Sequence, residues 1–143
     1  ESCLQRQNSV KEQFLKLNGE EGKYDRIIAL GKSLPPLDPH HMIAENLVSG
    51  CQSQMYLIAE EVNDKVFFKV GSDALISAGL AALLLEVYSG ESAETILTCP
   101  PLFIEELGIA TSLTPSRANG LYSVHLRMKQ EALKILLRKQ KKS

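Results

Sequence analysis

The sequence predicts an α+β fold in which a small antiparallel sheet of about three strands packs against helices. Apolar residues recur at helical spacing near both ends of the chain, whereas the middle is rich in strand-forming residues. There, residues 54–62 and 65–70 flank the turn pair Asn63-Asp64, a pattern typical of an antiparallel hairpin. The length of 143 residues fits one domain, so we expect a single domain over residues 1–143.

Two helices are expected before the sheet. Ser9 and Glu12 match a capping box, which predicts that the first helix begins near residue 9. The second helix is predicted to run from about Lys23 and to end before the Pro35-Pro36 pair, because proline cannot continue a helix.

The third strand of the sheet is expected at residues 47–49, which could enter from the other side of the hairpin. Residues 50–53 would then form the connecting tip, and this tip contains Cys51. Loop tips carry functional residues more often than strands do, so this segment is the first place to search for chemistry.

Helices return after the sheet. Ser72 or Asp73 is expected to cap a helix over residues 74–88. This helix is apolar on nearly all sides, which is typical of a central, buried helix. Short helices are expected at residues 92–98 and 101–107.

A final helix is predicted from the pair Thr114-Pro115, which are favourable N-cap and first-turn residues, to about Lys139. One side of this helix carries regularly spaced apolar residues. The residues expected to face inward are Leu121, Val124, Met128, Ala132, Ile135 and Leu136.

Charge and hydropathy exclude several classes of function. The formal net charge of -1 gives no overall field that would attract nucleic acid or an anionic membrane. The longest apolar stretch, residues 78–85, is too short to span a bilayer, and the N-terminus lacks the pattern of a signal peptide. We therefore expect a cytoplasmic protein without nucleic-acid or membrane partners. The missing initial methionine indicates a trimmed chain.

The three cysteines, Cys3, Cys51 and Cys99, are odd in number, widely separated and form no CxxC pair. This pattern predicts neither a disulfide framework nor a structural zinc site. A reducing compartment with at least one free thiol is the expectation.

Cys51 is the candidate reactive residue because of its position. It follows Gly50 in the predicted loop tip, and glycine gives the backbone freedom to present or withdraw the thiol. Its neighbours in sequence include no cation that would lower the pKa of the thiol. The alternative is that Cys51 is a small buried hydrophobic residue.

Three histidines are weaker candidates. His40 and His41 are adjacent in a predicted loop with no evident third ligand, so we expect solvated side chains and no metal site. His125 lies in the predicted final helix, where it could form a Cys–His pair with Cys51 or lie on the helix surface.

Asp73 and Arg117 are the remaining polar candidates. Asp73 could cap its helix, whereas Arg117 lies near a helix N-terminus, where a cation is disfavoured. A further task for Arg117 would be pairing with a carboxylate such as Asp73 or with a partner protein.

Three motifs in this order and spacing resemble the SufE family. An upstream segment, YDRIIALGKSL at residues 24–34, resembles the second helix of that family, and the matches span most of the chain. The motifs are GCQSQ at residues 50–54, SDA at 72–74 with GL at 79–80, and LTPSR at 113–117 with GL at 120–121.

The resemblance implies a fold shared with NifU-like iron–sulfur scaffolds and a role as activator of a cysteine desulfurase. The cysteine of the family motif falls on Cys51, which would accept sulfur from the desulfurase and carry it as a persulfide. Matching positions imply supporting or partner-contact roles for a further set of residues. These residues are Gly50, Gln52, Ser53, Asp73 and Arg117.

The family also implies partners for this chain. They are a SufS-like desulfurase, which binds the pyridoxal phosphate itself, and a SufBCD-like scaffold that receives the sulfur. The resemblance implies no cofactor bound by this chain, a cytoplasmic location and a possible homodimer. Relatives often carry Trp at the position of Tyr56, and a paralogous CsdE-type role remains an alternative to the main SufE-type one.

Two other functions stay open at this point. The NifU-like architecture would also suit a cluster scaffold or metal-binding module, although clusters are usually held by several thiolates. A stand-alone thiol enzyme would use Cys51 as nucleophile and His125 as base, which requires the two groups within hydrogen-bond reach.

Overall fold

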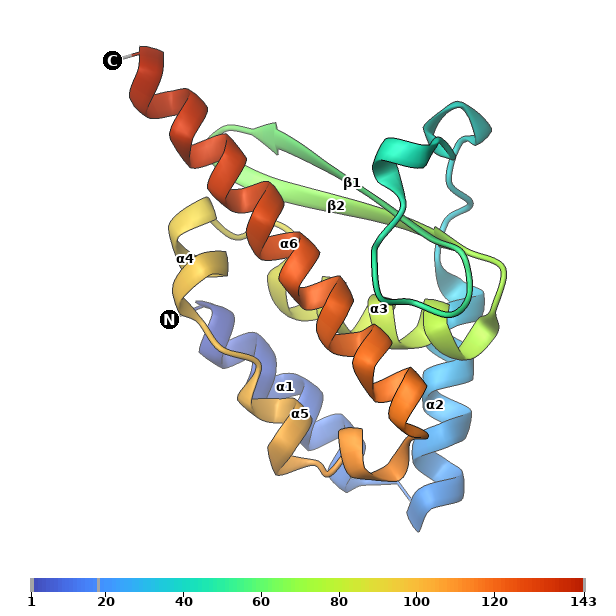
Figure 1. The fold of residues 1–143 in the computed structure, drawn as a ribbon. Coiled ribbons are helices and arrows are strands. Elements are labelled where there is room, and N and C mark those ends of the chain that lie inside the picture. Colours follow the sequence, from blue (N-terminus) through green and yellow to red (C-terminus); the bar gives the residue numbers. More distant parts are fainter. Residues whose placement is uncertain (1, 18, 143) are drawn as a thin grey trace.

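The predicted hairpin forms the sheet of the computed structural model, which describes residues 2–17 and 19–142 (Figure 1). Strands β1 (Met55–Val62) and β2 (Lys65–Ser72) pair antiparallel along their whole length. Asn63 and Asp64 both have positive φ, 52° and 65°, as a two-residue hairpin turn requires. The α+β class and the hairpin are therefore confirmed.

The expected third strand is reduced to a single bridge. Leu47 pairs with Tyr56, and Val48 N–H donates to Met55 O at 2.8 Å, but the sheet has two strands over the described residues. The pairing stops because the chain turns at Gly50, whose φ is 89°. The prediction of three strands is corrected to a two-stranded sheet, with an isolated bridge where the third strand was expected.

Helix α3 (Leu75–Tyr88) lies at the centre of the fold and is buried along most of its length, as its apolar sequence predicts. It packs against α2 (Gly19–Ser33), β2, α1 (Ser2–Leu15) and α6 (Pro115–Lys142). A Cβ atom at Gly79 would overlap the backbone of Ile27, so α2 and α3 approach each other more closely than larger residues would permit.

The predicted cap of α3 is wrong. Ala74 occupies the N-cap position in an extended conformation without a side-chain cap. Ser72 Oγ instead accepts a hydrogen bond from Ala74 N–H at 3.2 Å, and Asp73 is exposed. Ser72 therefore stabilises the turn that leads into α3 and does not cap the helix.

Helices α1 and α2 begin earlier than predicted, at Ser2 and Gly19. Ser9 therefore lies inside α1 and does not cap it. The apolar pattern of the sequence did not indicate this early start of α1, because the buried face of the helix includes the polar residue Gln7. The Gln7 side chain is satisfied there, donating to Pro100 O at 2.9 Å and accepting from Phe103 N–H at 3.1 Å.

A disulfide joins Cys3 to Cys99, which corrects the prediction that the chain forms none. It connects α1 to the residue that follows α4 (Ala93–Thr98). The two residues are 96 apart in sequence, but their Cα atoms are 6.8 Å apart, within the range of natural disulfides. Sequence spacing could not reveal this proximity.

An ion pair anchors α1 beside the disulfide. Glu91 is buried and accepts hydrogen bonds from Ser2 Oγ and from Arg6 Nη1, the latter at 3.0 Å. Arg6 Nη2 also donates to Ser89 O at 2.6 Å. The start of α1 is thereby attached to the turn that follows α3.

Helix α6 crosses the front of the molecule in Figure 1 and contacts α3, α4 and β1. Thr114 Oγ1 accepts from Arg117 N–H at 3.4 Å, as the predicted N-cap should. The residues of α6 that were predicted to face inward are buried, except Leu136, which is partly buried. Helix α5 (Leu102–Glu106) lies beside α1. None of the described helices is long and apolar enough to cross a membrane.

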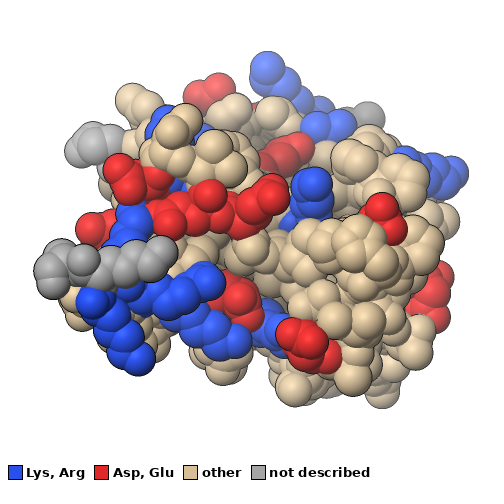
Figure 2. Space-filling view, turned by 90° about the horizontal axis from the view of Figure 1, so that it is seen from above, with Lys and Arg blue, Asp and Glu red and all other residues tan. Residues whose placement is uncertain are grey.

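The C-terminal part of α6 is attached to the hairpin turn by charges. Lys139 Nζ contacts Asp64 at 2.6 Å and also pairs with Glu61. Seen from above in Figure 2, basic and acidic side chains lie next to each other at one end of the molecule. These pairs are exposed, so each contributes little to stability.

Replacing both cysteines of the disulfide, as Cys3→Ala with Cys99→Ala, should lower the free energy of unfolding by about 3 kcal/mol. The bond restricts the unfolded chain over a long loop, and its loss frees that chain. Urea unfolding measures the difference. Dithiothreitol should lower the midpoint of the wild-type protein and leave that of the double variant unchanged; equal midpoints for both proteins without reductant would contradict the expectation.

Candidate functional site

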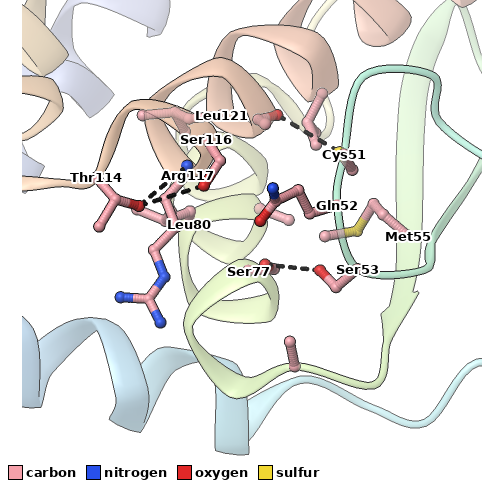
Figure 3. A pocket seen from close by; sticks show the side chains of 14 residues that line it. Cys51, Gln52, Ser53, Met55, Ser77, Leu80, Thr114, Ser116, Arg117 and Leu121 are labelled. Atoms are coloured by element: carbon pink, nitrogen blue, oxygen red, sulfur yellow. Dashed lines mark hydrogen bonds between the residues drawn. The ribbon is translucent and has the colours of Figure 1, made fainter.

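Cys51 lies in the loop of residues 47–54, between the short 3-10 helix η2 (Ala44–Asn46) and β1. It is the one cysteine outside the disulfide. Its side chain is half-buried, and Sγ donates a weak hydrogen bond to Gly120 O of α6 at 3.8 Å (Figure 3). The loop therefore presents the thiol toward α6 and not directly to solvent.

The thiol faces a cavity of about 360 Å³ between the loop, α3 and the first turns of α6. Apolar side chains of α3 and α6 form much of its wall, and polar side chains stand around them (Figure 3). The principal lining residues are Cys51, Gln52, Ser53, Ser77, Leu80, Ala81, Arg117, Gly120, Leu121 and Val124.

Gly50 is required by the position of the loop against α6. Its φ of 89° lies in the left-handed region that favours glycine. A Cβ atom at this position would also overlap the side chain of Ser123. A larger residue would be strained at this φ and would force either the Ser123 side chain or the loop to shift.

Three side-chain contacts hold the loop and the helix η2 that precedes it, in addition to the thiol. Ser53 Oγ donates to Ser77 Oγ of α3 at 2.9 Å. Arg127 of α6 donates through Nη1 to Leu47 O and through Nη2 to Glu45 O, each at 2.7 Å. Sequence reasoning missed Arg127, because a basic residue in the middle of a helix resembles an ordinary solvated residue.

Burial raises the pKa of the Cys51 thiol, and burial is the sole cause of the shift. A raised pKa means that the protonated thiol dominates at neutral pH. No charge among the described residues opposes this effect.

The two charged candidates are not paired with each other. Arg117 lines the cavity, but its guanidinium points away from Cys51 in Figure 3 and Nη1 donates to the Tyr24 hydroxyl at 3.2 Å. Asp73 is exposed and does not line the cavity. Within the described residues, no ion pair joins Asp73 to Arg117, so of the two tasks considered for Arg117 only contact with a partner protein stays open.

Gln52 and Ser53 follow the thiol and belong to the same wall of the cavity. The Gln52 side chain is exposed and projects from the loop over the cavity, whereas Ser53 is tethered to α3 (Figure 3). The structure thus gathers Gly50, Gln52 and Ser53 around Cys51, while Asp73 stays apart.

His125 does not form the Cys–His pair considered from the sequence. Its ring packs on Tyr88 with centroids 5.1 Å apart, and it is not among the residues that line the cavity. Burial, followed by the nearby charge of Lys129, lowers the pKa of His125 to about 4. Its buried Nε2 atom has no hydrogen-bond partner among the described residues. The alternative, a histidine on the surface of the helix, is not found either, because the ring is partly buried against Tyr88.

His40 and His41 lie in the short 3-10 helix η1 (Pro39–His41) and stack with centroids 3.9 Å apart. His40 Nδ1 lies 2.6 Å from Asp38, and this contact lowers the pKa of the Asp38 carboxyl. No group of three or more potential metal ligands occurs in the part of the chain that the structure describes.

Comparison with known proteins decides the family. Residues 8–132 match the family model described as SufE, Fe-S metabolism associated domain. The chain belongs to the SufE family. This membership associates it with iron–sulfur metabolism.

Several SufE-like proteins resemble the chain over most of its length. An uncharacterized SufE-like protein of Synechocystis sp. is 37% identical over 124 residues, covering 87% of this chain and 78% of that protein. One of Rhizobium etli is 35% identical over 130 residues, covering 87% and 88%. SufE-like protein 1, chloroplastic/mitochondrial, of Arabidopsis thaliana is 39% identical over 123 residues, covering 84% of this chain and 33% of that protein. This chain thus spans about a third of the plant protein.

A solved structure agrees with the fold. The solution structure of a hypothetical protein from Thermus thermophilus superposes with a TM-score of 0.77 at 27% identity, covering 92% of this SufE-family chain and 96% of that one. The arrangement of hairpin, loop and helices described above is therefore shared with an experimentally determined structure.

Alkylation of Cys51 by iodoacetamide should be slow at pH 7 and should still increase above the ordinary cysteine pKa of about 8.5. The folded protein holds the thiol protonated, so more base is needed to produce the thiolate. Intact-mass measurement of the rate from pH 6 to pH 10 tests this. A plateau reached below about pH 7 would show a lowered pKa and contradict the burial argument.

The free energy of unfolding should fall as the pH decreases from about 6.5 to about 4, by up to roughly 3 kcal/mol from His125 alone. The unfolded chain binds a proton on this residue in that range and the folded chain does not. Urea unfolding of His125→Phe should show a weaker pH dependence, whereas Tyr122→Phe, which changes an exposed residue of the same helix, should match the wild type. Identical pH profiles for wild type and His125→Phe would refute the expectation.

Proposed function

We propose that Cys51 accepts sulfur from a pyridoxal-phosphate cysteine desulfurase and carries it as a persulfide to an iron–sulfur cluster assembly scaffold. The observation that carries the proposal is the placement of the one cysteine outside the disulfide, in a loop that faces a cavity. Membership of a family associated with iron–sulfur metabolism supports it. The pyridoxal phosphate belongs to the desulfurase in this proposal.

The transfer is a displacement at sulfur. The Cys51 thiolate attacks the outer sulfur of a persulfide on the desulfurase cysteine, and a new S–S bond forms to Cys51. The former S–S bond breaks, and the desulfurase cysteine leaves as a thiolate. No net oxidation occurs. The Cys51 proton must leave first, and because burial raises the pKa of this thiol, docking of the partner has to assist.

The cavity and the disulfide both suit a persulfide carrier. A second cysteine near Cys51 would displace the carried sulfur and form a disulfide, but Cys3 and Cys99 are already joined to each other. The cavity of about 360 Å³ exceeds the volume that one additional sulfur atom needs. A persulfide directed into it would be sheltered from oxidants and small thiols.

The exposed residues near the loop are proposed contacts for the desulfurase. Gly50 and Gln52 flank the thiol, and Arg117 lies at the edge of the cavity. Asp73 is exposed at the end of β2 and could contact a partner that covers the loop. The cytoplasmic location, the homodimer and the single domain stay predictions.

The two alternative functions find less support. A cluster scaffold needs several thiolates, whereas two of the three cysteines form the disulfide. A stand-alone thiol enzyme needs a base beside its nucleophile, whereas His125 packs on Tyr88 and does not line the Cys51 cavity.

Incubation with a SufS-type desulfurase and free cysteine should add one sulfur atom to the protein, and peptide mapping should place it on Cys51. Intact-mass spectrometry without reductant measures the gain, and dithiothreitol should remove it. Cys51→Ser should show no gain, whereas Cys3→Ala with Cys99→Ala should behave like the wild type. A wild-type protein that gains no sulfur, or a gain that persists in Cys51→Ser, would rule out the proposal.

A further inference from the structure

Arg127 of α6 is attached to the first residue of the loop that carries Cys51 and to the helix η2 just before it. Nη1 donates to Leu47 O and Nη2 donates to Glu45 O, each at 2.7 Å. On its other side the guanidinium is held by Glu131, whose Oε2 accepts from Nε at 3.0 Å. The side chains of Arg127 and Glu131 are only 15% and 18% exposed. One guanidinium thus joins the backbone of the loop to a half-buried carboxylate of the helix.

The loop tip is held by weaker contacts. The Cys51 thiol is 3.8 Å from Gly120 O, and Ser53 makes one hydroxyl–hydroxyl bond of 2.9 Å to Ser77. Hydrogen bonds from a charged donor are shorter and stronger than neutral ones. Arg127 therefore provides the strongest side-chain attachment between the loop and the body of the protein.

The attachment and the thiol contact lie on the same face of α6. Gly120, Ser123 and Arg127 are separated by three and four residues, so they lie in one row along the helix. Gly120 meets the thiol, Ser123 lies against Gly50, and Arg127 holds the beginning of the loop. Because a helix is stiff, fixing the loop at Arg127 also fixes the position of Cys51 over the cavity.

We propose that Arg127 is a positioning residue that holds the Cys51 loop closed over the cavity, an inference that rests on the proposed sulfur-carrying function. When the loop opens, the hydrogen bonds from Arg127 break together with the Cys51–Gly120 and Ser53–Ser77 contacts, and all of them form again when the loop closes. The persulfide is thus sheltered between transfers, and Cys51 returns to the same place after each one.

Arginine is suited to this task and lysine is not. The planar guanidinium donates in several fixed directions at once, so it can reach two carbonyls and one carboxylate simultaneously. An ammonium group in the same place could keep the pair with Glu131 but could not bridge both carbonyls with the same geometry. The proposal therefore predicts that Arg127→Lys weakens the attachment of the loop, but less than Arg127→Ala does.

Arg127→Ala should increase the rate of Cys51 alkylation by iodoacetamide at pH 8 by about tenfold, because the loop opens more often when its attachment is lost. Arg127→Lys should give an intermediate rate. Alkylation is followed by intact mass and mapped to the Cys51 peptide. Once loaded with sulfur, Arg127→Ala should also lose it to dithiothreitol faster than the wild type does.

Two control variants separate positioning from general destabilisation. Arg6→Ala removes another partly buried guanidinium, one that contacts Glu91 and Ser89 and not the loop. It should lower the melting temperature while leaving the alkylation rate of the folded protein unchanged. Arg138→Ala removes an exposed cation from the same helix and should change neither quantity. If Arg127→Ala does not fold, the alkylation rates of Arg127→Lys and Glu131→Gln are compared with that of the wild type instead.

An unchanged alkylation rate in the Arg127 variants would overturn the inference, and so would an equal increase in Arg6→Ala. The alkylation measurement uses neither desulfurase nor persulfide. If wild-type Cys51 accepts no sulfur, the proposed function fails, while the rates still decide whether Arg127 positions the loop. If Cys51 accepts sulfur but the rates do not change, only the role of Arg127 fails.

Discussion

The burial of one face of α6 against α3, α4 and β1 is the constraint on which the site depends. Leu121 and Val124 belong to this packing and also form a wall of the cavity. The adjacent face of the same helix receives the Cys51 loop. The apolar contacts that stabilise the fold therefore also set the distance between the thiol and the cavity, and a shift of α6 would change both.

The environment of Cys51 keeps the thiol half-buried and protonated. A half-buried thiol with a raised pKa is protected from adventitious alkylation and oxidation, but it is also a poor nucleophile in the isolated protein. A catalytic cysteine in a stand-alone enzyme normally has a nearby base or cation. The arrangement is understandable for an acceptor whose partner supplies both the sulfur and the conditions for attack.

The N-terminal helix is held to the rest of the protein by unusually specific interactions. The Cys3–Cys99 disulfide, the hydrogen bonds of Gln7 and the Arg6–Glu91 ion pair all connect α1 to segments more than 80 residues away in sequence, with pair separations of 96, 93 and 85. They lie away from the loop and its cavity.

The sequence by itself determined the α+β class, the hairpin with its Asn63-Asp64 turn and the buried central helix, because these follow from local patterns. It also pointed to Cys51 as the candidate reactive residue, through its place in a loop and the resemblance of its motif, and that role stays a prediction. Only the tertiary structure decided the Cys3–Cys99 disulfide, the contact of Arg117 with Tyr24, the packing of His125 on Tyr88 and the attachment of the loop by Arg127. Each of these depends on which residues distant in sequence become neighbours, and local periodicity carries no information about that. Contacts between elements are fixed by how the apolar faces pack together.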